Sequence, residues 1–311
     1  MKPVISIIIV NYNSELYLKG CLDSIIKFTK NIDYEIIVVD NNSISREMEK
    51  FPEIYPQVKF FFSKENRGFG SGCNYGIKHS TGKFIAVVNP DIIINDNVFL
   101  SLFKIMEKYP EIGLCSPSFV NENGELTFTY NNFPNYRWEF LEFLGMDGTA
   151  KETKRLLSVL KEVKEKTIPF VVDTVTGACM FIRASVLKKI GDFDKNMFLY
   201  YEDTDLQKRI TEAGFKIACI PELRVVHLEN KSTKGGGDDS LFYINLYRSK
   251  LIYMKKHMNF IKRNIFRLMH IISFFIRTIT LAFRVKDKKN RHVKLSLYKK
   301  ILRIYLFNYS I

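Results

Sequence analysis

The sequence is poor in cysteine, and its five cysteines form no recognisable pattern. They are well separated, and no two of them make a Cys-x-x-Cys pair. Neither a disulfide framework nor a zinc knuckle is therefore expected, and a reducing cytosol fits this usage best. The residues are Cys21, Cys73, Cys115, Cys179 and Cys219.

Long uncharged runs are also absent from the sequence. No such run approaches the ~20 residues that a helix needs to span a bilayer. The apolar run from Val4 to Val10 is interrupted by Asn11-Tyr12-Asn13, and no small-residue cleavage site follows it. We therefore expect a buried strand there and not a signal peptide.

Acidic residues are scarce in the C-terminal part of the chain. Positions 241–311 hold 17 Lys and Arg but one acid, Asp287, whereas positions 1–240 hold 30 basic and 32 acidic residues. The formal net charge of +14 therefore belongs to a tail. Such a tail indicates either nucleic acid or the anionic face of a membrane as its partner.

The tail has a helical period. Arg263, Arg267, His270, Arg277 and Arg284 fall within an arc of roughly 100° on a helix, and apolar residues occupy the rest of the circle. This pattern predicts a basic amphipathic helix that lies in a membrane interface. The apolar positions are Ile265, Phe266, Leu268, Met269, Ile272, Phe275, Ile276, Ile279 and Phe283.

Two alternatives to the membrane exist for this helix. Nucleic acid is less suitable, because large aliphatic and aromatic side chains match acyl chains better than phosphate grooves. The helix can also pack on the rest of the chain with its arginines in water. We expect the membrane, and no binding of nucleic acid.

Before the tail, apolar strands alternate with helices. Strands are predicted near 4–10, 34–39, 58–62, 83–88 and 112–116, and helices at 15–28, after 70 and at 97–108. The fold class is therefore α/β, with a mostly parallel sheet covered by helices on both faces. We divide the chain into a catalytic domain at 1–234, a Gly-rich linker at 235–239 and the helical tail at 240–311.

Polar residues follow three of the predicted strands. These are Asn11-Tyr12-Asn13, Asp40-Asn41-Asn42-Ser43 and Asn89-Pro90-Asp91. Ligands of parallel sheets bind beyond the carboxyl ends of the strands, so all three segments should face one crevice. Asp40 can accept hydrogen bonds from ribose or base, and Asp91 can bind a hard cation. Each segment alone is also a common turn former.

The glycines at Gly68, Gly70 and Gly72 resemble a phosphate-binding loop only superficially. The Lys-Ser/Thr pair of a P-loop is missing, and a dinucleotide fingerprint should follow the first strand instead. We therefore exclude nicotinamide binding. The glycines allow a close approach of the backbone either to a ligand or to a neighbouring strand.

The densest acidic cluster is Glu202-Asp203-Thr204-Asp205, at the start of a predicted helix. Acids are favoured in a first helical turn by the helix dipole, but one of them near a crevice can also be a general base. His227 ends an apolar strand and is either a core residue or a metal ligand. An Asp, a His and a nucleoside diphosphate together suit Mn²⁺ or Mg²⁺.

Six segments, taken in order, carry a family resemblance over residues 4–228. They read VISIIIVNYNS, IIVVDNNS, ENRGFGSGCNYGI, FIAVVNPDIII, VTGACMFIRASVL and FDKNMFLYYEDTDLQKRITEAGFKIACIPELRVVH. With these the chain resembles the family 2 glycosyltransferases of GT-A fold, in their rhamnosyltransferase-like branch.

The resemblance implies a role for each matching residue. The catalytic base would be Asp203, with Glu202 beside it in the acceptor site. Asp91 and His227 would bind a divalent cation, Mn²⁺ or Mg²⁺. Asn89 stands where the family's Asp-x-Asp element has its first acid, which leaves Asp91 as its acidic ligand. The nucleotide-sugar contacts would come from Asn11, Tyr12, Asp40, Gly68, Gly70, Asn89 and Asp91.

The implied activity is transfer of a sugar with inversion. The leading donor is dTDP-rhamnose, with a UDP-sugar as the alternative, and the acceptor is a lipid-linked glycan of cell-surface polysaccharide synthesis. The tail would hold the enzyme peripherally on the cytoplasmic face of the membrane. A sugar-nucleotide pyrophosphorylase is disfavoured because its triphosphate loop is missing after the first strand. A non-catalytic sugar-nucleotide-binding scaffold is disfavoured because Asp91, Asp203 and His227 are all present.

Overall fold

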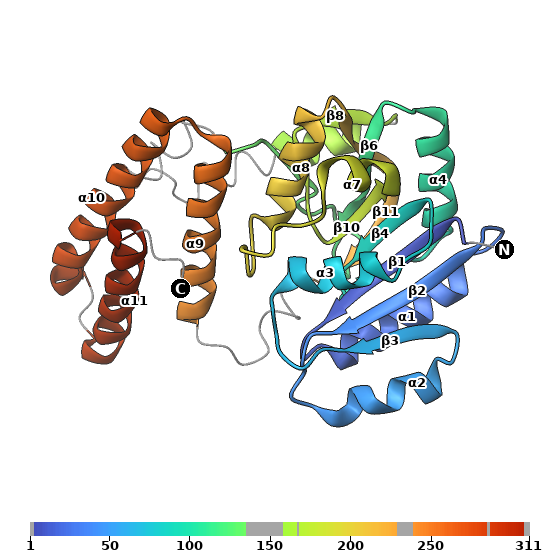
Figure 1. Ribbon diagram of the computed structural model, residues 1–311, viewed down its shortest axis with the longest axis horizontal. Helices are drawn as coiled ribbons and strands as arrows, with labels where there is room; N and C mark the ends of the chain where they lie inside the picture. The colour runs from blue at the N-terminus through green and yellow to red at the C-terminus, as the bar shows by residue number, and fades with distance from the viewer. Residues whose placement is uncertain (1–2, 135–157, 167, 229–238, 285–286, 308–311) are drawn as a thin grey trace. The chain divides into compact units, whose positions relative to one another are not determined.

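A computed structural model describes residues 3–134, 158–166, 168–228, 239–284 and 287–307 of the chain (Figure 1). The chain forms two compact units. The first comprises Met1–Phe133, Leu156–Lys195 and Glu202–Gly236, and the second comprises Pro134–Arg155, Asn196–Tyr201 and Gly237–Ile311. The proposed linker at 235–239 falls outside the described residues except for its last position, where a helix begins. The short segment 196–201 thus belongs with the C-terminal helices, which the sequence did not indicate.

The first half of the sheet follows the predicted alternation. Strands β3, β2, β1 and β4 lie side by side in that order and pair in parallel. The elements are β1 (Ile5–Asn11), α1 (Glu15–Phe28), β2 (Tyr34–Asp40), η1 (Arg46–Lys50), α2 (Phe51–Ile54), β3 (Val58–Phe62), α3 (Phe69–Lys78) and β4 (Phe84–Val88). Because parallel strands need a crossover connection, the helices between them cover the sheet.

The second half of the sheet is mixed. Strand β10 (Cys179–Arg183) lies between β4 and β6 (Ile112–Val120) and runs antiparallel to both. The segment before His227 forms one long strand, β11 (Lys216–His227), with an irregularity between Ile220 and Arg224. The remaining elements of this unit are β5 (Ile92–Ile93), α4 (Val98–Lys108), β7 (Tyr130–Asn131), a helix at 158–165, β8 (Phe170–Val172), β9 (Thr174–Val175), α7 (Ala184–Ile190) and α8 (Glu202–Glu212).

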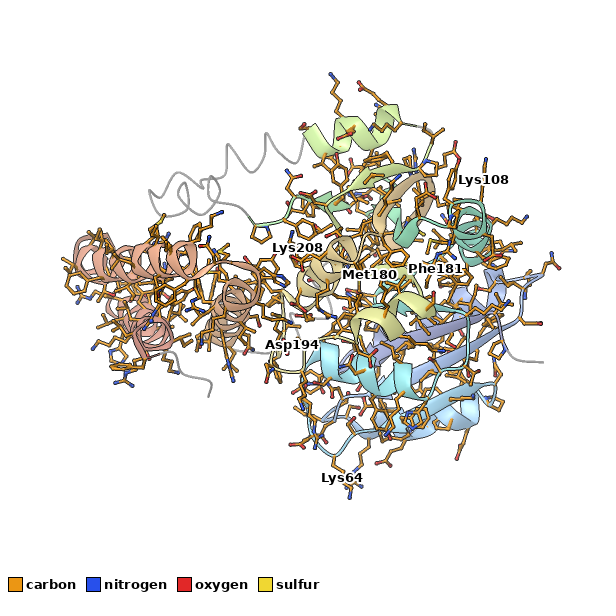
Figure 2. All side chains as sticks on the ribbon, turned by 45° about the horizontal axis from the view of Figure 1, so that its top comes forward. Lys64, Lys108, Met180, Phe181, Asp194 and Lys208 are labelled. Carbon is orange, nitrogen blue, oxygen red and sulfur yellow. The ribbon has the colours of Figure 1, made fainter. Side chains whose placement is uncertain are left out.

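Helices cover both faces of the sheet, as predicted. In β1, Ile7 and Ile9 belong to a core with α1 and α4, whereas Ile8 and Val10 belong to a second core with α3, α7 and α8. The same alternation sends Phe181 and Met180 of β10 into opposite cores (Figure 2). Side chains alternate between the faces of a strand, so a strand buried on both sides must be continuously apolar.

The second unit contains three long helices. They are α9 (Asp239–His257), α10 (Phe260–Arg284) and α11 (Lys288–Phe307). Their shared core contains Tyr247, Phe274, Ile301, Ile304 and Tyr305. The helical tail expected at 240–311 is therefore a small packed bundle. In the described part of the chain, residues Phe260–Leu281 of α10 are long and apolar enough to cross a membrane, by length and composition.

Candidate active site

The ends of β1 and β2 are joined by a polar network. Asn11 Nδ2 donates to Asp40 Oδ1 at 2.9 Å, and the hydroxyl of Ser43 donates to the same oxygen at 2.6 Å. The backbone N–H of Ser43 donates to Asp40 Oδ2 at 3.0 Å. Asp40 is thus fixed by three hydrogen bonds, and a carboxylate with about four lone pairs retains capacity for a ligand. Beside this network the ring of Tyr12 is 42% exposed.

A second network connects β2 to the start of α3. Asn41 Nδ2 donates to Asn66 Oδ1 at 2.8 Å and to the carbonyl of Gly68 at 3.1 Å, and the N–H of Gly68 donates to Asn66 Oδ1 at 2.9 Å. Gly68 caps α3 with a φ of 89°, a backbone conformation that residues other than glycine rarely adopt. The loop after β3 is therefore held at the same sheet edge as Asp40.

The structure decides how the other glycines of α3 are used. A Cβ on Gly72 would lie 2.7 Å from Val10 Cγ1, and one on Gly76 would lie 2.5 Å from Ile8 Cγ2. These two glycines bring α3 close to β1. A Cβ on Gly70 would lie 3.0 Å from Phe193 Cβ and 3.5 Å from Glu202. The space beside Gly70 is thus occupied by protein, and its ligand contact stays a prediction.

Asp91 and His227 lie together, as the resemblance implied. Asp91 is 1% exposed, and its Oδ1 lies 3.5 Å from His227 Nε2. Ile92 and His227 are paired between β5 and β11, and the N–H of Leu228 donates to the Asp91 carbonyl at 3.1 Å. Among the described residues, no group of three or more His, Cys, Asp and Glu side chains could hold a metal ion.

The other end of this segment leads to Asp203. The N–H of Asn89 donates to the carbonyl of Ala178 at 2.8 Å, and the preceding residue, Gly177, contacts Asp203. A Cβ on Gly177 would lie 2.8 Å from Asp203 Oδ2. Asp203 Oδ1 accepts from the backbone N–H of Thr204 at 2.7 Å and from its hydroxyl at 3.3 Å. Asp91 and Asp203 are therefore connected through two neighbouring strand ends.

The two acids that begin α8 have different surroundings. Glu202 is buried, and burial together with the charge of Asp203 raises the pKa of its carboxyl well above the usual range. Burial also raises the pKa of Asp203, but hydrogen bonds from Thr204 and Gly177 oppose that shift. Asp203 is the less buried of the two residues, and hydrogen bonds from Thr204 and Gly177 stabilise its charged form.

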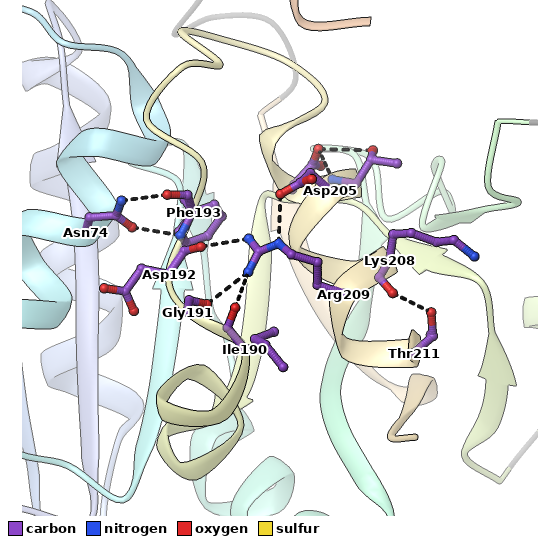
Figure 3. A network of polar contacts seen from close by, with 11 residues as sticks. Asn74, Ile190, Gly191, Asp192, Phe193, Asp205, Lys208, Arg209 and Thr211 are labelled. Carbon is purple, nitrogen blue, oxygen red and sulfur yellow. Dashed lines mark hydrogen bonds and ion pairs between the residues drawn. The ribbon is translucent and has the colours of Figure 1, made fainter. Parts of the chain in front are cut away.

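The third acid of the cluster, Asp205, supports the fold. It is fully buried and accepts from Arg209 Nε at 2.9 Å. The same guanidinium donates to three carbonyls at the C-terminal end of α7 and just after it, and Asn74 of α3 exchanges two hydrogen bonds with the backbone of Phe193 (Figure 3). The carbonyls belong to Ile190, Gly191 and Asp192. This network ties α8 to the loop against which Gly70 packs.

Sequence reasoning missed several residues that build the site. Gln207 is buried, accepts from the N–H of Val175 at 2.6 Å and donates to its carbonyl at 2.9 Å, which fixes the segment leading to Gly177. Asn66 and Asn74 are half-buried, and their amides also bond to neighbouring backbone groups. No sequence period marks such amides. These three residues and Gly177 lie in the segments of family resemblance, which named no role for them.

Comparison with known proteins identifies the relatives of this chain. Residues 6–191 match the sequence profile described as glycosyl transferase family 2. A low-salt glycan biosynthesis hexosyltransferase of Haloferax volcanii is 28% identical over 72% of this chain and 66% of its own length. An N-acetylglucosaminyl-diphospho-decaprenol L-rhamnosyltransferase of Mycobacterium tuberculosis is 24% identical over 82% of this chain and 85% of its own length. The rhamnosyltransferase WbbL of Escherichia coli is 28% identical over 72% of this chain and 83% of its own length.

Solved structures share the fold at low identity. GalNAc-T7, crystallised with UDP, GalNAc and Mn²⁺, has a TM-score of 0.61 and 16% identity, and the match covers 98% of this chain but 56% of that one. A mannosyltransferase from Pyrobaculum calidifontis, in complex with GDP-Man and Mn²⁺, has a TM-score of 0.58 and 14% identity, and the match covers 99% of this chain and 88% of that one. The predicted GT-A fold and the predicted resemblance to the rhamnosyltransferase-like branch are confirmed.

Proposed function

This chain belongs to glycosyl transferase family 2, and from that premise we propose that it is an inverting enzyme in which Asp203 is the general base. The observation that carries the proposal is the half-buried carboxylate of Asp203 at the start of α8, oriented by Thr204 and Gly177. Its raised pKa suits proton abstraction, because a stronger base takes a hydroxyl proton more readily. Asp203 removes the proton as the acceptor oxygen bonds to the anomeric carbon. The bond from that carbon to the nucleoside diphosphate breaks, and the diphosphate leaves from the opposite side.

The donor nucleotide is proposed to bind at the ends of β1 and β2. The hydrogen bonds from Asn11 and Ser43 hold Asp40 in one orientation, so its remaining acceptor capacity is available to ribose or base donors without reorganisation. The exposed ring of Tyr12 offers a face against which a base can stack. Gly68, Gly70 and Asn89 complete the proposed nucleotide-sugar contacts.

Asp91 and His227 suit a divalent cation. Two atoms that share an ion at about 2.1 Å can lie no more than about 4 Å apart, and the separation of 3.5 Å meets this condition. Carboxylate oxygen and imidazole nitrogen are suitable ligands for Mn²⁺ and Mg²⁺. Two protein ligands select the ion less strictly than a full protein cage does, and they leave coordination positions for diphosphate oxygens. When bound, such an ion supplies positive charge against the leaving diphosphate.

The sugar and the acceptor are proposed from the relatives. Two of them are named as rhamnosyltransferases, and one of these is named for a decaprenol-linked acceptor. We propose rhamnose as the sugar, with dTDP-rhamnose as the leading donor and a UDP-sugar as the alternative, and a lipid-linked glycan of cell-surface polysaccharide synthesis as the acceptor. The haloarchaeal relative, named for glycan biosynthesis, supports the same class of product.

The second unit supports a peripheral position on the cytoplasmic face of the membrane. The outer face of α10 carries a continuous row of exposed apolar side chains, and positions 241–311 are strongly basic. Such a surface suits an interface that combines acyl chains with anionic headgroups. A lipid-linked acceptor would be presented at that interface.

The transferase proposal is tested by replacing Asp203 with asparagine. The assay measures nucleoside diphosphate released from UDP-, dTDP- and GDP-sugars with Mn²⁺ or Mg²⁺ and a membrane extract. The Asp203→Asn variant should lose at least about 100-fold in turnover, because an amide cannot accept the proton. The matched control is Glu212→Gln, an exposed acid at the far end of the same helix, which should leave turnover unchanged.

Two results would contradict the proposal. Turnover by Asp203→Asn at the wild-type rate would exclude Asp203 as the base. Nucleotide-sugar binding without turnover by the wild-type protein, with every donor and extract, would favour the non-catalytic scaffold. Turnover with a single donor would identify the sugar.

A further inference from the structure

Two consecutive tyrosines before the proposed catalytic acids have an unusual backbone. Tyr200 has a φ of 68° and Tyr201 a φ of 66°. Bulky residues rarely adopt this left-handed region, and two in succession persist only when the surroundings impose the conformation. The chain enters α8 at Glu202 directly after them. Whatever holds these tyrosines therefore also constrains the backbone at the start of α8.

Three successive residues of this loop contact α9. Ser249 Oγ donates to the carbonyl of Leu199 at 3.0 Å. The ring centroids of Tyr200 and Phe242 lie 4.7 Å apart at an interplanar angle of 63°. The rings of Tyr201 and Tyr253 lie 5.5 Å apart at 53°. Aromatic pairs at these separations attract each other beyond their buried area.

The contact residues share one face of α9. At 100° per residue, Phe242, Ser249 and Tyr253 fall within about 40° of arc. Tyr247 and Leu251 lie about 140° to 180° from Phe242, and they belong to the core shared with α10 and α11. One side of α9 therefore holds the loop, while the other side is anchored in the helical bundle.

The loop needs such an anchor. The strained tyrosines would relax if the loop opened. This strain favours relaxation of the loop, and the contacts with α9 oppose it.

We propose that α9 is a positioning element of the reaction: Phe242, Ser249 and Tyr253 hold the loop at 199–201 in its strained conformation and so fix Glu202 and Asp203 at the start of α8. This inference rests on the proposed function of Asp203. It gives the C-terminal helices a part in the chemistry, in addition to the membrane attachment proposed above.

The test uses the full-length protein and two independent measurements. The first is hydrogen exchange of the backbone amides at 199–203. Phe242→Ala removes the ring that contacts Tyr200, so exchange there should be at least about tenfold faster than in the wild type. Because Phe242 is exposed, the substitution should not disrupt a core. Leu241→Ala is the matched control, since Leu241 is the neighbouring residue and is 57% exposed. Amides of β1 and β4 should not change in either variant.

The second measurement separates kcat from the donor KM. Phe242→Ala should lower kcat several-fold and leave the donor KM unchanged, because Asp203 acts on the acceptor hydroxyl and the donor contacts lie elsewhere. Tyr253→Ala should do the same, whereas Tyr253→Phe keeps the ring and should retain the wild-type kcat. A merely structural role would not lower kcat selectively while leaving the donor KM unchanged.

The outcomes are distinct. Unchanged exchange at 199–203 in Phe242→Ala would overturn the proposal, and so would faster exchange with an unchanged kcat. If the wild-type protein turns over no donor, the proposed function fails. In that case faster exchange still establishes that α9 holds the loop, and unchanged exchange refutes it.

Discussion

At the residue scale, the neighbours of Glu202 and Asp203 shift the carboxyl pKa values of these two adjacent acids to different extents. Glu202 packs beside Gly70 and Cys73 and feels the charge of Asp203, so its carboxyl resists ionisation. Asp203 accepts hydrogen bonds that stabilise its charged form. Of the two, Glu202 should therefore hold its proton to higher pH. This difference supports the proposal that Asp203, and not Glu202, is the base.

The burial of Glu202 predicts a pH-dependent cost in stability. Its folded-state pKa lies above its ordinary value near 4.5, so the carboxyl contributes most to stability below pH 4.5 and this contribution is lost as the pH rises. Glu202→Gln has no proton to lose and should raise the melting temperature at pH 7 by about 3 °C or more. The gain should vanish near pH 4. Thermal unfolding at both pH values measures it.

The exposed Glu212 gives the control for this experiment. Glu212→Gln, on the same helix, should show no pH-dependent gain because its carboxyl is in contact with water. An equal gain from Glu202→Gln at pH 4 and pH 7 would contradict the burial argument.

At the element scale, α10 exposes a large apolar face, while its buried side mixes apolar and polar residues. Its buried side includes Phe266, His270 and Phe274, and Arg267 also turns inward. Arg267 donates to the carbonyls of Tyr305 and Leu306 at 2.5 and 2.6 Å, at the C-terminal end of α11 where a cation is favoured. Arg267, one member of the basic arc, therefore helps to hold the bundle together. The exposed face carries Ile261, Ile265, Leu268, Ile272, Phe275, Ile276 and Ile279.

Membrane binding should depend on this apolar face. The double substitution Ile272→Asp and Ile276→Asp should abolish flotation of the protein with phospholipid vesicles, because charged side chains are strongly disfavoured among acyl chains. Ile54→Asp is the control, since Ile54 is an equally exposed apolar residue on α2. It should float with the vesicles like the wild type. Continued flotation of the double variant would place the contact elsewhere.

At the scale of the whole molecule, charge is unevenly distributed. Positions 1–240 are close to neutral, and nearly all of the net charge of +14 comes from positions 241–311. Two copies of so basic a segment repel each other, whereas an anionic surface attracts it. This distribution favours a lipid surface over a second copy of the chain as the partner of the helical bundle.

The charge distribution predicts how lipid composition and salt act. Adding anionic lipid to neutral vesicles should increase the bound fraction severalfold, at about 1 kcal/mol per basic residue near the surface. Raising the salt to about 0.5 M should remove that increase by screening, but binding to neutral vesicles through α10 should persist. Sedimentation with vesicles of both kinds measures this. Complete loss of binding at high salt would mean that α10 contributes no apolar contact.

Much of the first unit could be predicted from sequence because its information is local. Continuous apolar runs identified β1, β2 and β4, and polar residues after them identified the site edge, since parallel strands end together. The proximity of Asp91 to His227 had a different source. Nothing in their spacing of 136 positions predicts a contact, and the resemblance to a family supplied it.

The sequence by itself thus determined which segments are strands and helices, where the polar residues gather and where the charge lies. Tertiary structure decided the insertion of β10 between β4 and β6, the contact of Gly177 with Asp203 and the attachment of residues 199–201 to α9. It also decided which face of α10 is buried. A helical period defines two faces, but the partner that covers one of them lies far away in the sequence. Local patterns therefore cannot choose between them.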